Sequence, residues 1–280
     1  MLGSVFSPYY ARARRDGAVD PLEHSAMNVA LYHRGSSVWS LNERRRDEVH
    51  RDSSSLTLGA STVRWERDTL VISLVERTTP FLPARVLGDN RIVGTVRLHP
   101  RVRTESPHAL DAKGLHRWWS VAPLARVEVE LTEPRISWKG DGYHDANAGD
   151  GPLEETFRAW DWTRASTPDG AAILYDAETL DGRRAPHGRR ITLDGRVEAL
   201  EGPVRAPLPR TTWGIDRATR ADLGRATLTK TLEDTPFYAR SVLSTRLLGH
   251  DVSAMHESLD LTRFQRGWVQ ALIPFRTRRV

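Results

Sequence analysis

The residues best suited to chemistry stand close together between positions 116 and 145. Asp145 follows Tyr143 by two residues, and Trp118 follows His116 by two. In an extended segment, residues two apart point to the same side. Two such pairs on adjacent strands would place an acid, a phenol, a histidine and an indole around one point. Apolar rings favour the protonated form of a carboxyl group and stabilise a nearby cation, so this set fits acid-initiated chemistry on an apolar molecule.

The same region also allows an interpretation without chemistry. Five of the nine tryptophans of the chain lie between residues 116 and 162: Trp118, Trp119, Trp138, Trp160 and Trp162. These rings would then form a hydrophobic core, and His116 would be a hydrogen-bonded core histidine. Composition alone favours this second interpretation.

The surrounding sequence predicts β-strands that carry these side chains. Residues 125–131 alternate strictly between apolar and charged side chains, as a strand with one wet face does. Turn residues such as those at 194–195 separate further runs of this kind. These runs cover residues 38–43, 56–58, 61–67, 70–76, 91–98, 190–193, 225–232 and 258–264. The best helix candidate is short, at residues 153–159.

Many short antiparallel strands imply an all-β fold, built as a sandwich or a barrel. A turn-rich stretch at residues 166–170 follows the aromatic cluster, and a fresh run of strands starts at Ala172. We therefore expect two antiparallel β domains with little helix. The first, residues 1–152, would carry most of the site, and the second would be residues 153–280.

Composition and missing motifs exclude several function classes. The chain of 280 residues has no cysteine, which rules out disulfides, thiolate metal sites and cysteine nucleophiles and fits a reducing cytoplasmic compartment. The sequence contains no phosphate-cradling glycine loop, dinucleotide-binding glycine fingerprint, Gly-x-Ser-x-Gly elbow or His-Glu-x-x-His helix. Nucleotide, nicotinamide and zinc-protease chemistry are therefore not indicated.

No metal site is expected either. The acidic segment at residues 141–150 departs from the ligand spacing of a calcium loop. Its Asp141, Asn147 and Asp150 are typical of a turn in which such side chains bind backbone amides. His250 and His256 match no ligand spacing, and we expect them at surface or turn positions.

The charge pattern indicates a solvated surface. The net charge is +5, but basic and acidic residues are interleaved, and the arginine clusters at residues 12–15, 44–46 and 276–279 are short. A nucleic-acid groove needs a continuous basic face with stacking aromatics, so we expect no nucleic-acid partner but some attraction for anionic lipid headgroups. No stretch approaches the roughly 18 to 20 apolar residues of a spanning helix. The start of the chain carries its charges after its apolar part, unlike a secretory signal.

Several compositionally unusual blocks run from residue 3 to about residue 276. They are Gly3-Ser-Val-Phe-Ser-Pro-Tyr-Tyr10, Asn28-Val-Ala-Leu-Tyr32, His116-Arg-Trp-Trp119, Gly140-Asp-Gly-Tyr143, Trp160-Asp-Trp162, Thr231-Leu-Glu-Asp-Thr-Pro-Phe-Tyr-Ala-Arg240 and His256-Glu-Ser-Leu-Asp260. Together with Asp145 and Asn147, these blocks resemble the acyclic carotenoid 1,2-hydratase family, also called hydroxyneurosporene synthases.

This resemblance implies a lyase of carotenoid biosynthesis in phototrophic bacteria that uses no cofactor. Such enzymes add water across the terminal C1=C2 double bond of acyclic carotenes such as neurosporene and lycopene, giving the tertiary 1-hydroxy product. The resemblance also implies two lipocalin-like β domains, in agreement with the strand pattern. The functional residues of the family fall on His116, Trp118, Tyr143 and Asp145, and all four residue types are present.

A mechanism follows for the expected reaction. Protonation of C2 gives a tertiary cation at C1, which water captures. We expect Asp145 to donate the proton, with its pKa raised by apolar surroundings. Trp118 and Tyr143 would offer π faces to the cation. His116 would orient the water, take its proton or set the protonation of Asp145, and the sequence leaves these three roles open.

Two further expectations concern where the protein works and which other function would fit the sequence. A carotene dissolves in a bilayer, so we expect a cytoplasmic protein held peripherally at the inner or intracytoplasmic membrane. The rival class is a non-catalytic lipocalin-like protein that binds a carotenoid or another lipid. That protein would need the same apolar cavity but no acid.

Overall fold

The computed structural model describes residues 1–4, 6–17, 19–33, 36–79 and 90–280, and it confirms the predicted all-β fold class. Its helices are short: α1 (Pro8–Asp16), α2 (Leu261–Phe264), α3 (Gly267–Leu272) and the 3-10 turns η1 (Pro21–His24), η2 (Arg46–Glu48), η4 (Leu153–Glu155) and η5 (Ile273–Phe275). Within this described part of the chain, no helix has the length and apolar character needed to cross a membrane.

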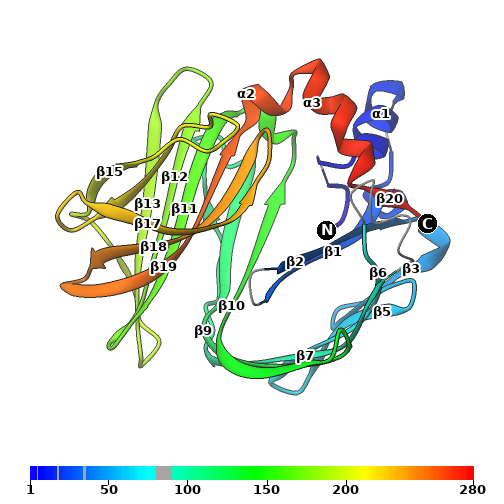
Figure 1. Cartoon of the computed structure of the whole chain (residues 1–280), viewed down its shortest axis with the longest axis horizontal. Coiled ribbons are helices and arrows are strands. Elements are labelled where there is room, and N and C mark those ends of the chain that lie inside the picture. The colour runs from blue at the N-terminus through cyan, green and yellow to red at the C-terminus, as the bar shows by residue number, and fades with distance from the viewer. Residues whose placement is uncertain (5, 18, 34–35, 80–89) are drawn as a thin grey trace. The chain divides into compact units, whose positions relative to one another are not determined.

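The chain forms two compact units (Figure 1). Unit 1 consists of Met1–Pro100, Ala125–Gly142 and Gln270–Val280, and unit 2 consists of Arg101–Leu124 and Tyr143–Val269. Two long strands, β9 (His116–Glu133) and β10 (Ile136–Gly149), contribute residues to both units. The predicted division into residues 1–152 and 153–280 cuts the chain once. The compact units instead each combine segments from separate parts of the chain, so this division stays a prediction.

Unit 1 combines a hairpin with a large antiparallel sheet. The hairpin is β1 (Ser25–His33) and β2 (Ser36–Arg44), to which β20 (Arg278–Arg279) adds in parallel. The sheet runs β10-β9-β7-β6-β5-β4-β3. The strands not yet named are β3 (Val49–Arg51), β4 (Ser55–Leu58), β5 (Ser61–Glu66), β6 (Thr69–Arg77) and β7 (Arg91–Val102). The short β8 (His108–Ala109), which belongs to unit 2, pairs with β9. Val127, Val129 and Leu131 of β9 are buried in its core, as their alternation predicted.

Unit 2 is built on a second antiparallel sheet, in the order β14-β13-β12-β11-β19-β18-β17 (Figure 1). Its strands are β11 (Phe157–Thr167), β12 (Gly170–Thr179), β13 (Arg184–Thr192), β14 (Val197–Ala199), β17 (Ala226–Asp234), β18 (Tyr238–Leu247) and β19 (His250–Asp260). The hairpin of β15 (Val204–Leu208) and β16 (Arg217–Ala221) packs on one face, where Leu208 meets Leu174 and Leu243. Because alternate residues point to opposite faces, Trp160 and Trp162 of β11 point to the other face.

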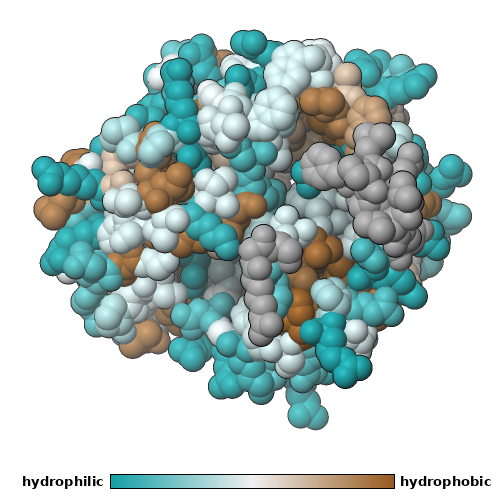
Figure 2. Space-filling model, in the orientation of Figure 1, coloured by the Kyte–Doolittle hydropathy of each residue, from teal (hydrophilic) through white to brown (hydrophobic). Residues whose placement is uncertain are grey.

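Among the described residues, both large sheets run from one edge strand to another. Strands with one solvent-exposed face also explain why hydrophilic side chains are common on the surface. On the face shown in Figure 2, hydrophilic residues are interspersed with separate hydrophobic ones.

Three local predictions were wrong. Residues 258–264 are not one strand, because β19 ends at Asp260, whose Oδ1 accepts the Arg263 amide at 2.9 Å and caps α2. The predicted helix at 153–159 is only the turn η4, after which β11 begins at Phe157. Residues 141–149 form no turn but continue β10. Pairing with β9 outweighs the turn preference of their Asp, Asn and Gly residues.

Glycine is required at the start of β12. Gly170 has φ +146°, and a Cβ there would lie 1.8 Å from the Ile191 carbonyl oxygen on β13, whereas a Cβ on Gly182, at φ +82°, would meet nothing within 4 Å. We expect Gly170→Ala to lower the free energy of unfolding by about 3 kcal/mol or more, and Gly182→Ala by about 1 kcal/mol from backbone strain alone. Denaturant unfolding of both variants measures this. Equal losses would contradict the packing of β12 against β13.

Candidate active site

Asp145 is the centre of a hydrogen-bonded cluster inside unit 2. Its Oδ2 accepts the indole N–H of Trp118 at 2.9 Å and the hydroxyl of Tyr143 at 3.2 Å. Trp118 is completely buried, while Tyr143 and Asp145 are partly buried. Three of the four residues expected at the site therefore meet, because the two residues of β10 share a side and face β9.

Aromatic rings from the large sheet of unit 2 surround this cluster. The Tyr143 ring lies 5.4 Å from that of Trp162, and the Trp118 ring lies 5.8 Å from that of Tyr175. Trp162 and Tyr175 are directly paired across β11 and β12, so they point to the same face. The Arg164 guanidinium lies 5.2 Å from the centre of the Tyr143 ring. Aromatic rings thus surround the two side chains that donate to the carboxyl group.

The surroundings change the acidity of Asp145. Burial raises its pKa to about 6, and the negative charge of Glu257 acts in the same direction, while the hydrogen bonds from Trp118 and Tyr143 oppose the rise. A carboxyl group with this pKa is half protonated at pH 6 and keeps roughly a tenth of its protons at pH 7. Burial and the Asp145 charge also raise the pKa of Tyr143 and of Tyr175, so both phenols stay protonated.

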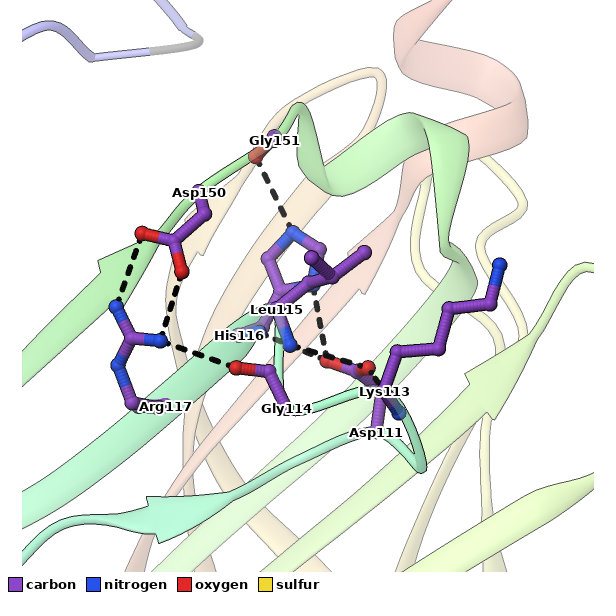
Figure 3. Close-up of polar contacts among 8 residues, drawn as sticks. All are labelled: Asp111, Lys113, Gly114, Leu115, His116, Arg117, Asp150 and Gly151. Carbon is purple, nitrogen blue, oxygen red and sulfur yellow. Dashed lines mark hydrogen bonds and ion pairs between the residues drawn. The ribbon is translucent and has the colours of Figure 1, made fainter.

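His116 is buried in a separate network within the same unit (Figure 3). Its Nδ1 lies 3.1 Å from Asp111 Oδ2, and its Nε2 lies 3.2 Å from the Gly151 carbonyl oxygen. Its ring also packs on Phe157 at 5.1 Å. Both nitrogens therefore face acceptors, and the hydrogen bonds of His116 go to Asp111 and Gly151 rather than to Asp145.

Asp111 was not singled out from the sequence. Burial opposes its ionisation, but hydrogen bonds from His116 and from the amides of Leu115 and Lys113 together hold its pKa below the ordinary value. The signal was the Asp-Ala-Lys-Gly sequence at 111–114, since an aspartate that binds amides two or more residues ahead is typical of a turn. Beside it, Arg117 forms an exposed two-bond ion pair with Asp150, at 2.8 and 3.0 Å (Figure 3).

A cavity of about 340 Å³ lies at the β12–β13 part of the large sheet of unit 2. Tyr175 lines it, but so do Leu174 and Leu200, from the face that packs against the β15–β16 hairpin, and Arg220 of that hairpin. None of Asp145, Trp118, Tyr143 and Trp162 lines it. This volume is at the lower end of the range for small-molecule sites, about 300 to 1,000 Å³. Searched over the described residues, His, Asp and Glu side chains form no group of three or more arranged to hold a metal ion.

The prediction for His256 was wrong. This side chain is only 1% exposed and lies on the face of the sheet opposite Trp162, with Nδ1 2.9 Å from Thr163 Oγ1 and Nε2 3.0 Å from Ser258 Oγ. Ser258 donates to Asp161 at 2.6 Å. Burial lowers the pKa of His256 to about 3 and raises that of Asp161 to about 7. No sequence motif marks the buried position of His256. The side chain is buried because the alternation along β19 turns it toward the core.

The fold and the site define an all-β, lipocalin-like protein with an acid among aromatic rings. The solved structure of a putative AttH from Nitrosomonas europaea is similar, with a TM-score of 0.57 over 83% of this chain and 80% of that chain. The two sequences are 13% identical, so this likeness concerns the fold alone.

Sequence comparison identifies the family. The profile of the carotenoid hydratase CrtC family matches residues 1–280. The acyclic carotenoid 1,2-hydratase of Thiocapsa roseopersicina is 44% identical over 282 residues, covering 100% of this chain and 68% of its own length. That of Rubrivivax gelatinosus is 40% identical over 280 residues, covering 98% and 67%. The chain belongs to the carotenoid hydratase family.

The Trp118 indole controls the acidity of Asp145. Its hydrogen bond favours the ionised carboxylate, so Trp118→Phe should raise the pKa of Asp145 above its value of about 6. Trp119→Phe is the matched control, because the Trp119 indole donates to Thr104 instead. A carbon NMR titration of the Asp145 carboxyl measures both. A lowered pKa in Trp118→Phe, or equal shifts in both variants, would contradict the cluster.

Proposed function

We propose that this chain adds water to the terminal C1=C2 double bond of acyclic carotenes such as neurosporene and lycopene, giving 1-hydroxy carotenoids without a cofactor. The relatives named acyclic carotenoid 1,2-hydratase, at 44% and 40% identity, support the reaction class. The observation that carries the chemistry is Asp145, a carboxyl group with a pKa of about 6 held against Trp118 and Tyr143.

Asp145 acts as the acid in this mechanism. Its proton passes to C2 of the alkene, the π electrons form the new C–H bond, and C1 becomes a tertiary cation. The rings of Trp118, Tyr143, Trp162 and Tyr175 lie around this acid, and in this mechanism they stabilise the charge. One desolvated cation–π contact contributes about 2 kcal/mol, which is roughly thirtyfold in rate. Water then bonds to C1.

His116 belongs to this proposal as a positioning residue. Its bonds to Asp111 and Gly151 fasten the first residue of β9 to the segment that follows β10. Trp118 stands two residues further along β9. What supports this role over the orientation of water is that both ring nitrogens are already engaged by acceptors.

The rival proposal is a carrier that encloses a whole carotenoid. A carrier needs an apolar cavity but no acid, whereas here burial keeps a carboxyl group partly protonated among aromatic rings. This observation favours the enzyme.

Replacement of Asp145 tests the enzyme directly. We expect anaerobic incubation with lycopene in detergent to give a product heavier by one water, and Asp145→Asn to slow this about 100-fold or more, because the acid is removed while the shape is kept. The control Asp141→Asn changes an exposed carboxyl group on the same strand and should leave the rate unchanged. The product is measured by mass spectrometry.

The pH profile is part of the same test. The active form of Asp145 is the protonated one, so the wild-type rate should fall as pH rises through about 6. Near wild-type turnover by Asp145→Asn would remove the acid from the mechanism. Bound but unchanged lycopene in the wild-type protein would favour the carrier.

We further propose that the protein works as a peripheral protein on the cytoplasmic side of the inner or intracytoplasmic membrane, where a carotene dissolves. Two exposed tryptophans of unit 2 support this. The rings of Trp213 and Trp268 stack at 5.9 Å and 24°, yet remain 45% and 44% exposed. Arg263 donates to the Trp213 carbonyl, and Arg266 nearby is exposed. Indole rings beside cations suit the interface of an anionic bilayer.

Vesicle flotation tests this membrane surface. We expect the protein to float with anionic phospholipid vesicles at low salt and less at high salt, because salt screens the arginines. The double variant Trp213→Ala/Trp268→Ala should float less than wild type. Trp138→Ala, which removes an equally exposed tryptophan from unit 1, should not. Flotation of the double variant at the wild-type level would exclude this surface.

A further inference from the structure

A row of side chains crosses the large sheet of unit 2 on the face that carries the aromatic cluster. Directly paired residues of antiparallel strands point to the same face. The pairs run from β17 to β12: Glu233 with Arg240, Arg240 with Glu257, Glu257 with Trp162, and Trp162 with Tyr175. Glu257 therefore lies beside Trp162, whose ring contacts Tyr143, and Tyr143 bonds to Asp145.

Arg240 forms a close ion pair with Glu257. The guanidinium Nε and Nη2 lie 3.0 and 2.8 Å from Glu257 Oε1. The side chains are 28% exposed for Arg240 and 25% for Glu257, so solvent screens this ion pair only in part. Burial opposes the charge of Arg240, but Glu257 and Glu233 outweigh it and raise the Arg240 pKa.

The site thus contains two carboxyl groups in opposite environments. Asp145 is surrounded by rings, and burial raises its pKa to about 6, whereas Glu257 is paired with the Arg240 guanidinium. Hydration gives one proton to C2 and takes one from the attacking water. Two carboxyl groups on the same face allow one to give the first proton and the other to take the second.

We propose that Glu257 is the general base of the hydration, which rests on the proposed function. Its carboxylate orients a water molecule toward C1. As the water oxygen forms the C–O bond, its O–H bond breaks and the proton passes to Glu257. The hydration then leaves Asp145 ionised and Glu257 protonated. A proton transfer from Glu257 to Asp145 through water restores both groups.

The other polar groups of the cluster are less suited to this step. Tyr143 and Tyr175 remain protonated phenols, and Arg164 has no acceptor atom. The two nitrogens of His116 are engaged by Asp111 and Gly151. Two further acceptors are His187, paired with Tyr175, and His108, whose ring lies 6.0 Å from that of Trp118. We favour Glu257 because it is a carboxylate that Arg240 orients and whose charge acts on Asp145.

Glu257→Gln tests the role against the matched control Glu233→Gln, one strand further from Asp145 on the other side of Arg240. With lycopene in detergent, we expect kcat about 100-fold below wild type for Glu257→Gln and near wild type for Glu233→Gln. Near wild-type kcat for Glu257→Gln would overturn the proposal. Absence of hydrated product from the wild-type protein would instead overturn the proposed function.

The pH profile separates a base from a merely structural residue. The titratable and charged groups that face this cluster are Tyr143 on the strand of Asp145, His108 on β8, Arg164 on β11, Tyr175 on β12, His187 on β13, and Glu257 on β19 with its partner Arg240 on β18. Removing the Glu257 charge lowers the pKa of Asp145, so the alkaline limb of the residual activity should move to lower pH. Glu257→Asp, which keeps the charge, should restore part of kcat and leave the limb in place.

Chemical rescue provides a second readout. In Glu257→Ala, the space of the side chain is open beside Arg240, and added formate should raise kcat at least tenfold over the variant alone. The same formate should not raise the rate of Asp145→Asn, whose missing group is the acid. Two results together would overturn the proposal: formate does not rescue Glu257→Ala, and the alkaline limb of Glu257→Gln does not move. Glu257 would then be only a structural partner of Arg240.

Discussion

The structure of the site depends on keeping one carboxyl group poorly solvated without leaving it unbonded. Asp145 accepts two hydrogen bonds, from Trp118 and Tyr143, and both donors belong to aromatic side chains. Each donor therefore gives a hydrogen bond to the carboxyl group and at the same time places an apolar ring, rather than water, beside it. Burial and hydrogen bonding act on the pKa in opposite directions, and burial is the larger effect. An acid that is usable near neutral pH results from this balance.

Strand register connects this acid to the rest of unit 2. The rings that enclose Asp145 come from β11 and β12, and the second carboxyl group comes from β19. None of these residues is near the others in sequence, but pairing of the strands places Glu257, Trp162 and Tyr175 in one row. The opposite face of the same sheet carries a different polar network around His256 and Asp161. The sheet thus separates two sets of titratable groups by the alternation of its side chains.

The sequence predicted the local part of this arrangement. The all-β class followed from alternation, and the contact of Tyr143 with Asp145 followed from their spacing of two. The family resemblance pointed to four residues, His116, Trp118, Tyr143 and Asp145. Trp162, Tyr175 and Glu257 were beyond reach as site residues, because cross-strand register depends on pairing that one sequence does not specify. His256 was misplaced for the same reason, and residues 261–264 were predicted as strand although Asp260 ends β19 and its side chain caps α2.

The two adjacent tryptophans of β9 differ in what they contact. Trp118 is completely buried and meets Asp145, whereas Trp119 points the other way and donates to Thr104. A slip of β9 by one residue would turn the Trp119 indole toward the acid, so the tryptophan doublet by itself does not distinguish the correct alignment from the shifted one. His116 does, because the slip would remove its imidazole from both Asp111 and Gly151. The hydrogen bonds of His116 therefore make the shifted register of β9 less stable than the observed one.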